Sequence, residues 1–135
     1  MIAEVAQAIM QKYNGNAVLK NALSGGLHFQ RAPQDQSKPY GVFFIDGIDR
    51  EEIMGGADDN ITHVDIQISV FSDDDTGGQL IAELAGAVTS CFHWQGIILE
   101  GYLYLKMQEV QVDPILYVDE IWQANLMYEL WMQKQ

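Results

Sequence analysis

The chain has 135 residues, 48% of them hydrophobic, and a formal net charge of −12 at pH 7. This length suits one domain spanning residues 1–135, and the apolar content is too high for a disordered acidic tail. Seven basic residues against nineteen acidic ones argue against the binding of nucleic-acid phosphates, which requires a basic surface.

The first forty residues predict a helix followed by a short strand. Apolar residues recur at spacings of three and four up to Asn14-Gly15, as in an amphipathic helix: Ile2, Ala6, Ile9 and Tyr13. Ala17–Leu23 adds a short second turn of helix. Leu27–Gln30 is predicted as a brief edge strand, because prolines interrupt the residues that follow it.

Two strands are predicted in the middle of the chain, joined by a long loop. Tyr40–Asp46 is apolar on both faces, as in a strand inside a sheet. In His63–Ser72 apolar and polar residues alternate with the period of two expected of a half-buried strand. The connection Gly47–Thr62 is long for a loop without structure of its own, and such loops tend to be functional or disordered.

The second half of the chain predicts one helix and two more strands. Asp75 or Thr76 offers an N-cap for the helix Gln79–Phe92. Its inner stripe consists of Leu80, Leu84, Val88 and Cys91, flanked by Ile81, Ala85 and Phe92. Gly101–Val112 is the next strand, and Asp113-Pro114 is a turn. In the last strand, Ile121–Gln133, one face carries Trp122, Ala124, Leu126, Tyr128, Leu130 and Met132.

Segregated strands joined by short turns favour an α+β domain. We expect a mostly antiparallel four- to five-stranded sheet with two main helices packed on one face. No internal repeat or linker divides the sequence, so a second domain is not expected.

The polar motifs predict no catalytic, cofactor-binding or metal-binding residue. Asp73–Asp75 resembles the start of a calcium loop, but two ligands of such a loop are missing. His28, His63 and His93 lack the spacing and the neighbouring cysteines of a zinc site. Cys91 falls in the apolar stripe and is predicted to be a core residue. We therefore expect no enzyme, no cofactor and no metal, although a catalytic group assembled only in space stays possible.

The compartment follows from what the sequence lacks. The start of the chain has no basic and apolar signal segment, and a single cysteine cannot form an internal disulfide. The longest uncharged stretch, Leu84–Leu99, is too short and too polar to span a membrane. We expect a protein made in the cytoplasm, without a membrane partner.

The acidic residues are concentrated in one part of the chain. Asp46–Asp75 holds ten acidic residues and one basic residue, which is most of the net charge. The candidates for a functional acidic surface are Asp49, Glu51, Glu52, Asp58, Asp59, Asp73, Asp74 and Asp75. A solvated loop that only increases solubility is the alternative interpretation.

Three apolar side chains fall on the polar faces of predicted strands. Met127 and Trp131 interrupt the polar side of the last strand, and Phe71 that of His63–Ser72. A second apolar face indicates a partner or another subunit, so these three residues are candidates for a subunit interface. The alternative is that helices or loops cover both faces of the sheet.

A series of features runs in a fixed order over nearly the whole chain. An N-terminal helix leads to Gly25-Gly26-Leu27-His28-Phe29 and, after a proline link, to Pro39-Tyr40-Gly41-Val42-Phe43-Phe44-Ile45. The strand His63–Phe71 is followed directly by the helix Leu80–Phe92. A strand near Tyr102–Val112, the Asp113-Pro114 turn and a strand beginning near Trp122 complete the order. In this pattern the chain resembles the small tail-completion, or tail-terminator, proteins of long-tailed bacteriophages and prophages.

The resemblance implies a structural virion protein that assembles into a ring, commonly of six copies. Such a ring caps the tail tube, stops its growth and receives the head, so the tube protein and a head-connector protein are expected partners. The protein would occupy the virion tail, and the host cytoplasm during assembly. DNA would pass through the bore without specific binding, and carboxylates facing the channel would repel it.

A function from another class uses the same charge. An acidic module that mimics DNA and inhibits a nucleic-acid enzyme would spread carboxylates along an elongated surface. Here they cluster in one third of the chain, which favours the tail protein.

Overall fold

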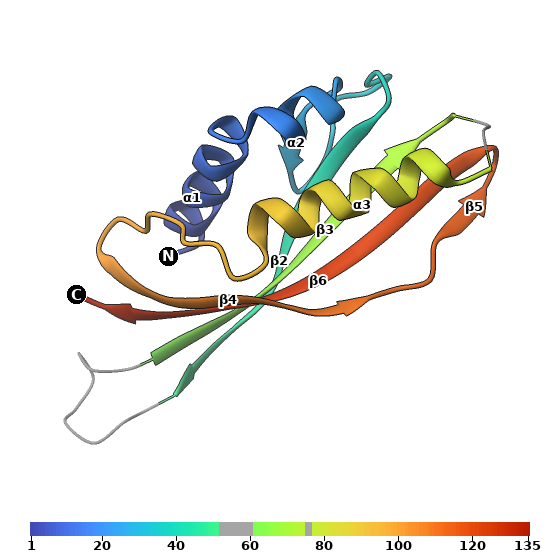
Figure 1. The fold of residues 1–135 in the computed structure, drawn as a ribbon. Coiled ribbons are helices and arrows are strands. Elements are labelled where there is room, and N and C mark those ends of the chain that lie inside the picture. Colours follow the sequence, from blue (N-terminus) through green and yellow to red (C-terminus); the bar gives the residue numbers. More distant parts are fainter. Residues whose placement is uncertain (52–60, 75–76) are drawn as a thin grey trace.

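The computed structural model describes residues 1–51, 61–74 and 77–135 and shows a sheet with helices on one face (Figure 1). In chain order the elements are α1 (Ile2–Asn14), α2 (Ala17–Ala22), β1 (Leu27–Phe29), β2 (Tyr40–Glu51), β3 (Ile61–Ser72), α3 (Gln79–Phe92), β4 (Tyr102–Val112), β5 (Leu116–Val118) and β6 (Ile121–Lys134). Among the described residues, no helix is long and apolar enough to cross a membrane.

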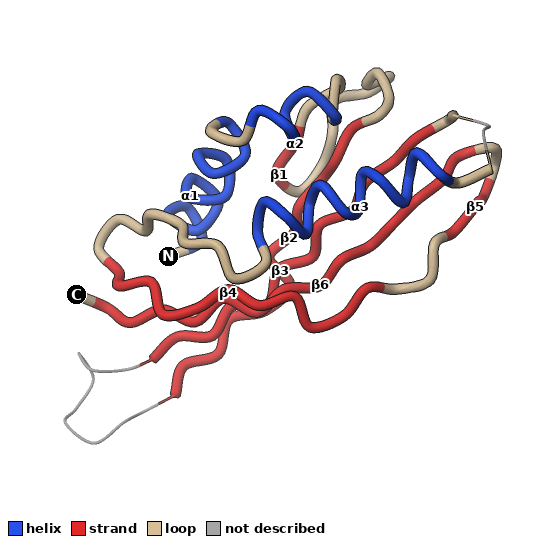
Figure 2. The backbone as a smooth tube through the Cα atoms, in the orientation of Figure 1, coloured by secondary structure: helices blue, strands red, loops and turns tan. Residues whose placement is uncertain are grey.

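The sheet has six strands in the order β1-β2-β3-β6-β4, with β5 also paired to β6. Only β1 and β2 are parallel, and the other pairs are antiparallel. The α+β class and the mostly antiparallel sheet are confirmed, and Figure 2 shows the helices together on one side of the strands. The expected number of strands is too low because β5 has three residues, too few to show an alternating pattern.

The core lies between the helices and one face of the sheet. The side chains of Val64, Ile66, Ile68 and Val70 on β3 are 0% exposed, as the alternation in this strand predicts. Cross-strand partners on β6 continue this face, including Leu126 and Tyr128.

The two long helices bury almost the predicted stripes. In α3 the buried residues are Ile81, Leu84, Val88, Cys91 and Phe92, whereas Leu80 is half-buried. In α1 the structure buries Val5, Ala8, Ile9 and Tyr13 and leaves Ile2 49% exposed. A residue at the border of the apolar stripe can face either the core or the solvent. The packing of the helix on the sheet decides which, and the sequence pattern alone does not.

The β2–β3 hairpin is longer than predicted. β2 continues to Glu51 after a bulge between Ile45 and Gly47, and β3 already begins at Ile61. Both ends of the predicted loop Gly47–Thr62 are therefore paired strand, because cross-strand hydrogen bonds extend past the apolar core. The expected N-cap residues Asp75 and Thr76 lie outside the described residues, and Gly78 precedes α3 in a left-handed conformation.

Candidate functional site

The three predicted interface residues lie on the face of the sheet opposite the helices, here named the open face. Phe71 pairs with Gln123, Met127 with Gln67, and Trp131 with His63. Paired residues of antiparallel strands point to the same face, and the alternate residues of β3 and β6 are the buried core. The prediction that these three side chains leave the core face is confirmed, and all three are half-buried.

One end of the open face is built around Trp131. The His63 ring lies 4.1 Å from the indole, centroid to centroid, and Lys106 Nζ lies 5.1 Å from the ring centroid. His63 Nε2 in turn lies 3.4 Å from Glu129 Oε1. The indole Nε1 is buried without a hydrogen-bond partner in the described part of the chain. A buried indole N–H normally finds an acceptor, so Trp131 offers an unused donor beside a cation–π contact.

The other end of the open face is also aromatic. Tyr40 and Phe71 stack with ring centroids 5.0 Å apart, and His28 approaches Tyr40 edge-on at 6.4 Å. These rings come from β2, β3 and β1, so the stack extends to the β1 edge of the sheet.

Between the aromatic ends lies a polar network centred on Asn125. Its Oδ1 accepts hydrogen bonds from Ser69 Oγ at 2.6 Å and from Gln123 Nε2 at 2.9 Å. Gln67 Nε2 lies 3.0 Å from Ser69 Oγ and 3.4 Å from Asn125 Oδ1. Ser69 and Asn125 are buried on this face, where Gln67 and Gln123 hydrogen-bond to them. The open face is thus an ordered platform with a polar centre and aromatic ends.

The most exposed apolar cluster lies elsewhere and was missed from the sequence. Ile115, Leu116, Tyr117 and Val118 are 42%, 45%, 51% and 61% exposed around β5. The signal was available as four consecutive apolar residues directly after the Asp113-Pro114 turn.

The described acidic candidates form two groups at opposite ends of β3. Asp49 is exposed on β2 opposite His63, and the backbone of Glu51 pairs with Ile61 nearby. Asp73 is exposed and Asp74 half-buried just after the other end of β3. Ten residues separate His63 from Asp73, which is about 33 Å along an extended strand. Glu52, Asp58, Asp59 and Asp75 lie outside the described residues.

The histidine and cysteine near the end of α3 have structural contacts. His93 Nδ1 accepts a hydrogen bond from the backbone N–H of Glu109 at 2.9 Å, and the Trp94 N–H donates to Met107 O at 2.8 Å. Cys91 is buried in the core, as predicted, and burial raises the pKa of its thiol to about 11.

Outside the open face and β5, the described residues form a hollow but no metal-binding group. Among the described residues, no group of three or more histidines, cysteines and carboxylates could hold a metal ion. A hollow of about 280 Å³ lies between the end of α1 and residues 96–98, with Gln11, Lys12 and Asn16 among its lining residues. It lies at neither the open face nor β5.

The comparisons with known proteins agree with one another. The sequence matches the model of one family, described as "Tail completion protein gp17", over residues 7–120. A chain in the virion of a native gene transfer agent particle has a similar fold, with a TM-score of 0.79 at 15% identity over 94% of this chain and 92% of that chain. A second solved chain has a TM-score of 0.62 at 10% identity over 100% of this chain and 96% of that chain. No curated protein matches the sequence.

Proposed function

The chain belongs to the tail completion protein gp17 family of phage structural proteins, and from this premise we propose that it closes the end of a tail tube as a ring of copies. The ring stops growth of the tube and gives the head its docking surface. The subunits act by contact alone, and no bond is made or broken.

The observation that best supports this proposal is the open face. A helix-free sheet face with aromatic clusters at both ends suits protein association, because aromatic side chains give large contact areas for little lost freedom. In this proposal Phe71, Met127 and Trp131 contact a neighbouring subunit.

The carboxylates fit a channel through which DNA passes. We place Asp49, Glu51, Glu52, Asp58, Asp59, Asp73, Asp74 and Asp75 along the bore or at its mouths. With β3 roughly parallel to the channel, the described members of this set would stand near its two openings. Repulsion from phosphates acts within about a Debye length, roughly 8 Å at physiological salt, which keeps DNA from adhering.

The partners in this proposal are other copies of the chain, the tube protein and a head-connector protein. Six copies are the number that the family resemblance implies. The protein would assemble in the host cytoplasm and remain in the virion tail, without cofactor, metal or membrane.

Analytical ultracentrifugation over a concentration series, with and without the cognate tube protein, tests the ring. We expect a closed oligomer, at the latest when the tube is present. Trp131→Ala and Phe71→Ala should weaken association and leave the thermal midpoint nearly unchanged. Ser90→Ala, on the exposed side of α3, is the matched control.

Two outcomes would contradict the proposal. A chain that stays monomeric with the tube protein present would favour the DNA mimic, above all if it bound a nucleic-acid enzyme instead. Particles that lack the chain but carry tails of normal length with attached heads would also exclude a terminator.

A further inference from the structure

The β5–β6 hairpin ends in an unfavourable turn. Val118 pairs directly with Ile121, so the turn consists of Asp119 and Glu120 alone. Both have positive φ, 54° and 65°. Two-residue hairpin turns of this kind favour Asn-Gly or Asp-Gly, since a side chain such as that of Glu120 is strained in the left-handed region. Glycine would stabilise this turn better, so the glutamate is not explained by folding.

The same hairpin exposes apolar side chains on both of its faces. Leu116 and Val118 lie on the open face, in register with Gln123 and Ile121. Tyr117 lies on the opposite face and contacts Trp122, with ring centroids 4.4 Å apart. Residues 115–121 are named here the apolar hairpin. Its apolar residues are adjacent and ordered, which is typical of a binding surface and not of scattered surface hydrophobics.

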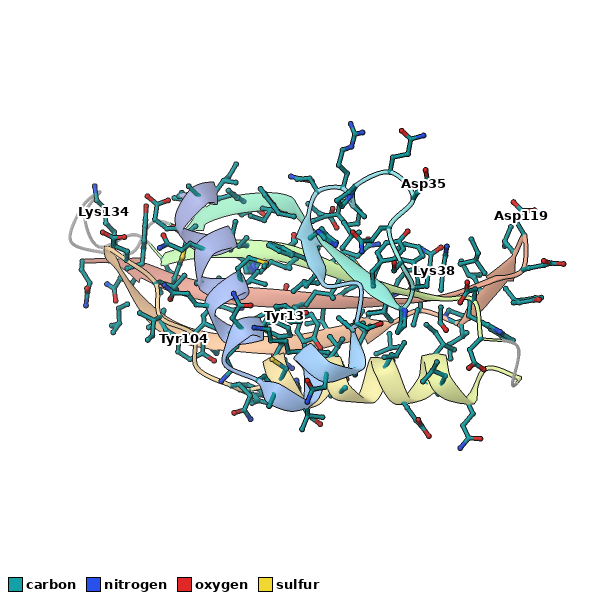
Figure 3. The ribbon with its side chains drawn as sticks, turned by 90° about the horizontal axis from the view of Figure 1, so that it is seen from above. Tyr13, Asp35, Lys38, Tyr104, Asp119 and Lys134 are labelled. Atoms are coloured by element: carbon teal, nitrogen blue, oxygen red, sulfur yellow. The ribbon has the colours of Figure 1, made fainter. Side chains whose placement is uncertain are left out.

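Along the sequence, the charge around the apolar hairpin is of one sign. Residues 107–133 include five acidic residues and no basic one. Of the five, Asp119 and Glu120 form the turn of the hairpin and Asp113 lies just before it. Asp119 stands at the far end of the molecule from Lys134, at opposite ends of β6 (Figure 3). A partner surface that fits here must be apolar with basic residues at its margin.

One part of this chain has that character. The first forty residues contain four basic and two acidic residues, whereas the whole chain has a net charge of −12. Within them, the β1 edge presents Phe29, which is 36% exposed and stacks on Phe43 at 5.0 Å. Arg31, Asp35 and Lys38 follow it in the link to β2, which therefore carries two basic residues and one acidic residue.

The topology places these two surfaces at opposite edges of the sheet. β1 ends the sheet on one side, and β4 and β5 line β6 on the other. A contact between unlike edges is head-to-tail, and such contacts repeat from copy to copy and form a ring where the rotation between copies closes. In the competing arrangement, a strand of another copy would pair with the free edge of β4. Two backbone groups in the middle of that edge are already bonded, since the Glu109 N–H donates to His93 and the Met107 carbonyl accepts from Trp94.

We propose that the apolar hairpin of one copy packs on the β1 edge of the next copy, with Asp119 and Glu120 facing Arg31 and Lys38. Leu116, Tyr117 and Val118 then cover Phe29. This inference rests on the proposed ring and specifies the contact that closes it.

A charge swap tests the contact. The double variant Asp119→Lys, Glu120→Lys and the double variant Arg31→Glu, Lys38→Glu each place like charges at every contact of a ring. Each alone should associate at least tenfold more weakly than the wild type, because every contact then places like charges against each other. An equimolar mixture should regain wild-type association, because both contacts of an alternating ring are then attractive. Thermal unfolding of each variant verifies that it is folded.

A cross-linking experiment does not depend on charge. Val118→Cys and Gln30→Cys copies, mixed and treated with a flexible bismaleimide, should form heterodimers, whereas neither variant alone should cross-link. Cys91 stays silent because it is buried and its pKa is raised to about 11.

The outcomes separate this contact from the ring itself. Rings that persist in both charge variants, or equal cross-linking of Val118→Cys with itself, overturn the contact and leave the ring intact. Loss of tube-protein binding with unchanged self-association would assign the hairpin to the tube, which also overturns the inference. A wild-type chain that never oligomerises, even with the tube protein, overturns both proposals.

Discussion

The two faces of the sheet are built by the same strands but differ in burial and in side-chain chemistry. On the helix-covered face, Ile66 and Ile68 of β3 are 0% exposed and lie in one continuous core with α3. On the open face, the intervening residues of the same strand are half-buried, apart from buried Ser69, and form aromatic contacts and a polar network. The alternation along β3 thus places core residues on one face and, in our proposal, residues of a subunit contact on the other. The following predictions test that division.

The largest effect is expected on the covered face. Ile68→Ala removes a fully buried side chain between β2 and β6 and should reduce the free energy of unfolding by about 2–5 kcal/mol. The adjacent change Gln67→Ala, on the open face, should reduce it by less than about 1 kcal/mol. Urea unfolding of both variants measures the difference. Equal losses would mean that both faces are core.

A smaller loss is expected from the polar centre of the open face. Asn125→Ala leaves the donors of Ser69, Gln67 and Gln123 without their shared acceptor. Buried donors without a partner cost about 1–3 kcal/mol, and the thermal midpoint should fall accordingly. Gln111→Ala, an exposed amide on β4, is the control. An unchanged midpoint would show that water replaces the network at no cost.

The covered face should also produce an alkaline limit to stability. Burial, and then a 2.8 Å hydrogen bond to Glu109 Oε1, raise the pKa of the Tyr128 hydroxyl above its ordinary value of 10. In the unfolded chain this tyrosine ionises near pH 10, whereas in the folded chain it stays neutral. The contribution of Tyr128 to the free energy of unfolding is therefore fully present below pH 10. Above pH 10 it decreases by up to about 1.4 kcal/mol per pH unit. Tyr128→Phe should remove this part of the slope between pH 10 and 12, measured by urea unfolding. An identical slope in the variant would contradict it.

On the open face, one substitution should leave stability equal or higher and weaken self-association. Trp131→Phe keeps an aromatic ring between His63 and Lys106 but removes the unpartnered indole N–H. The free energy of unfolding should stay equal or rise, because a buried donor without a partner is lost. Self-association should weaken by about threefold to tenfold, because a phenyl ring gives the neighbouring copy less contact area than an indole. Sedimentation and thermal unfolding of the same sample measure both. A lower stability with unchanged association would make Trp131 a core residue.

Periodicity predicted the elements with long alternating or helical patterns, and local cues were insufficient for the rest. Helix Gln79–Phe92 is confirmed at both ends, and the alternation in His63–Ser72 correctly assigned Phe71 to the face away from the core. β5 was missed because three apolar residues carry no period. The two acidic groups could not be separated, since both belong to the acidic stretch Asp46–Asp75 and only the length of β3 holds them apart. The polar network around Asn125 could not be predicted, because Asn125 bonds to Ser69 and Gln67, which precede it by 56 and 58 positions in the sequence.

The hairpin turn gives the smallest effect and the clearest separation of folding from association. Glu120→Gly relieves a side chain at a φ of 65° and should stabilise the fold by about 0.5–1 kcal/mol. The same change removes one of the carboxylates that face the next copy, so association should weaken while the thermal midpoint rises. Asp119→Asn is the matched control, because asparagine tolerates the left-handed region and only the charge is lost. It should weaken association without changing the midpoint. If both variants associate like the wild type, the strain at Glu120 has no role in assembly, and the charge at this end of the sheet serves only solubility.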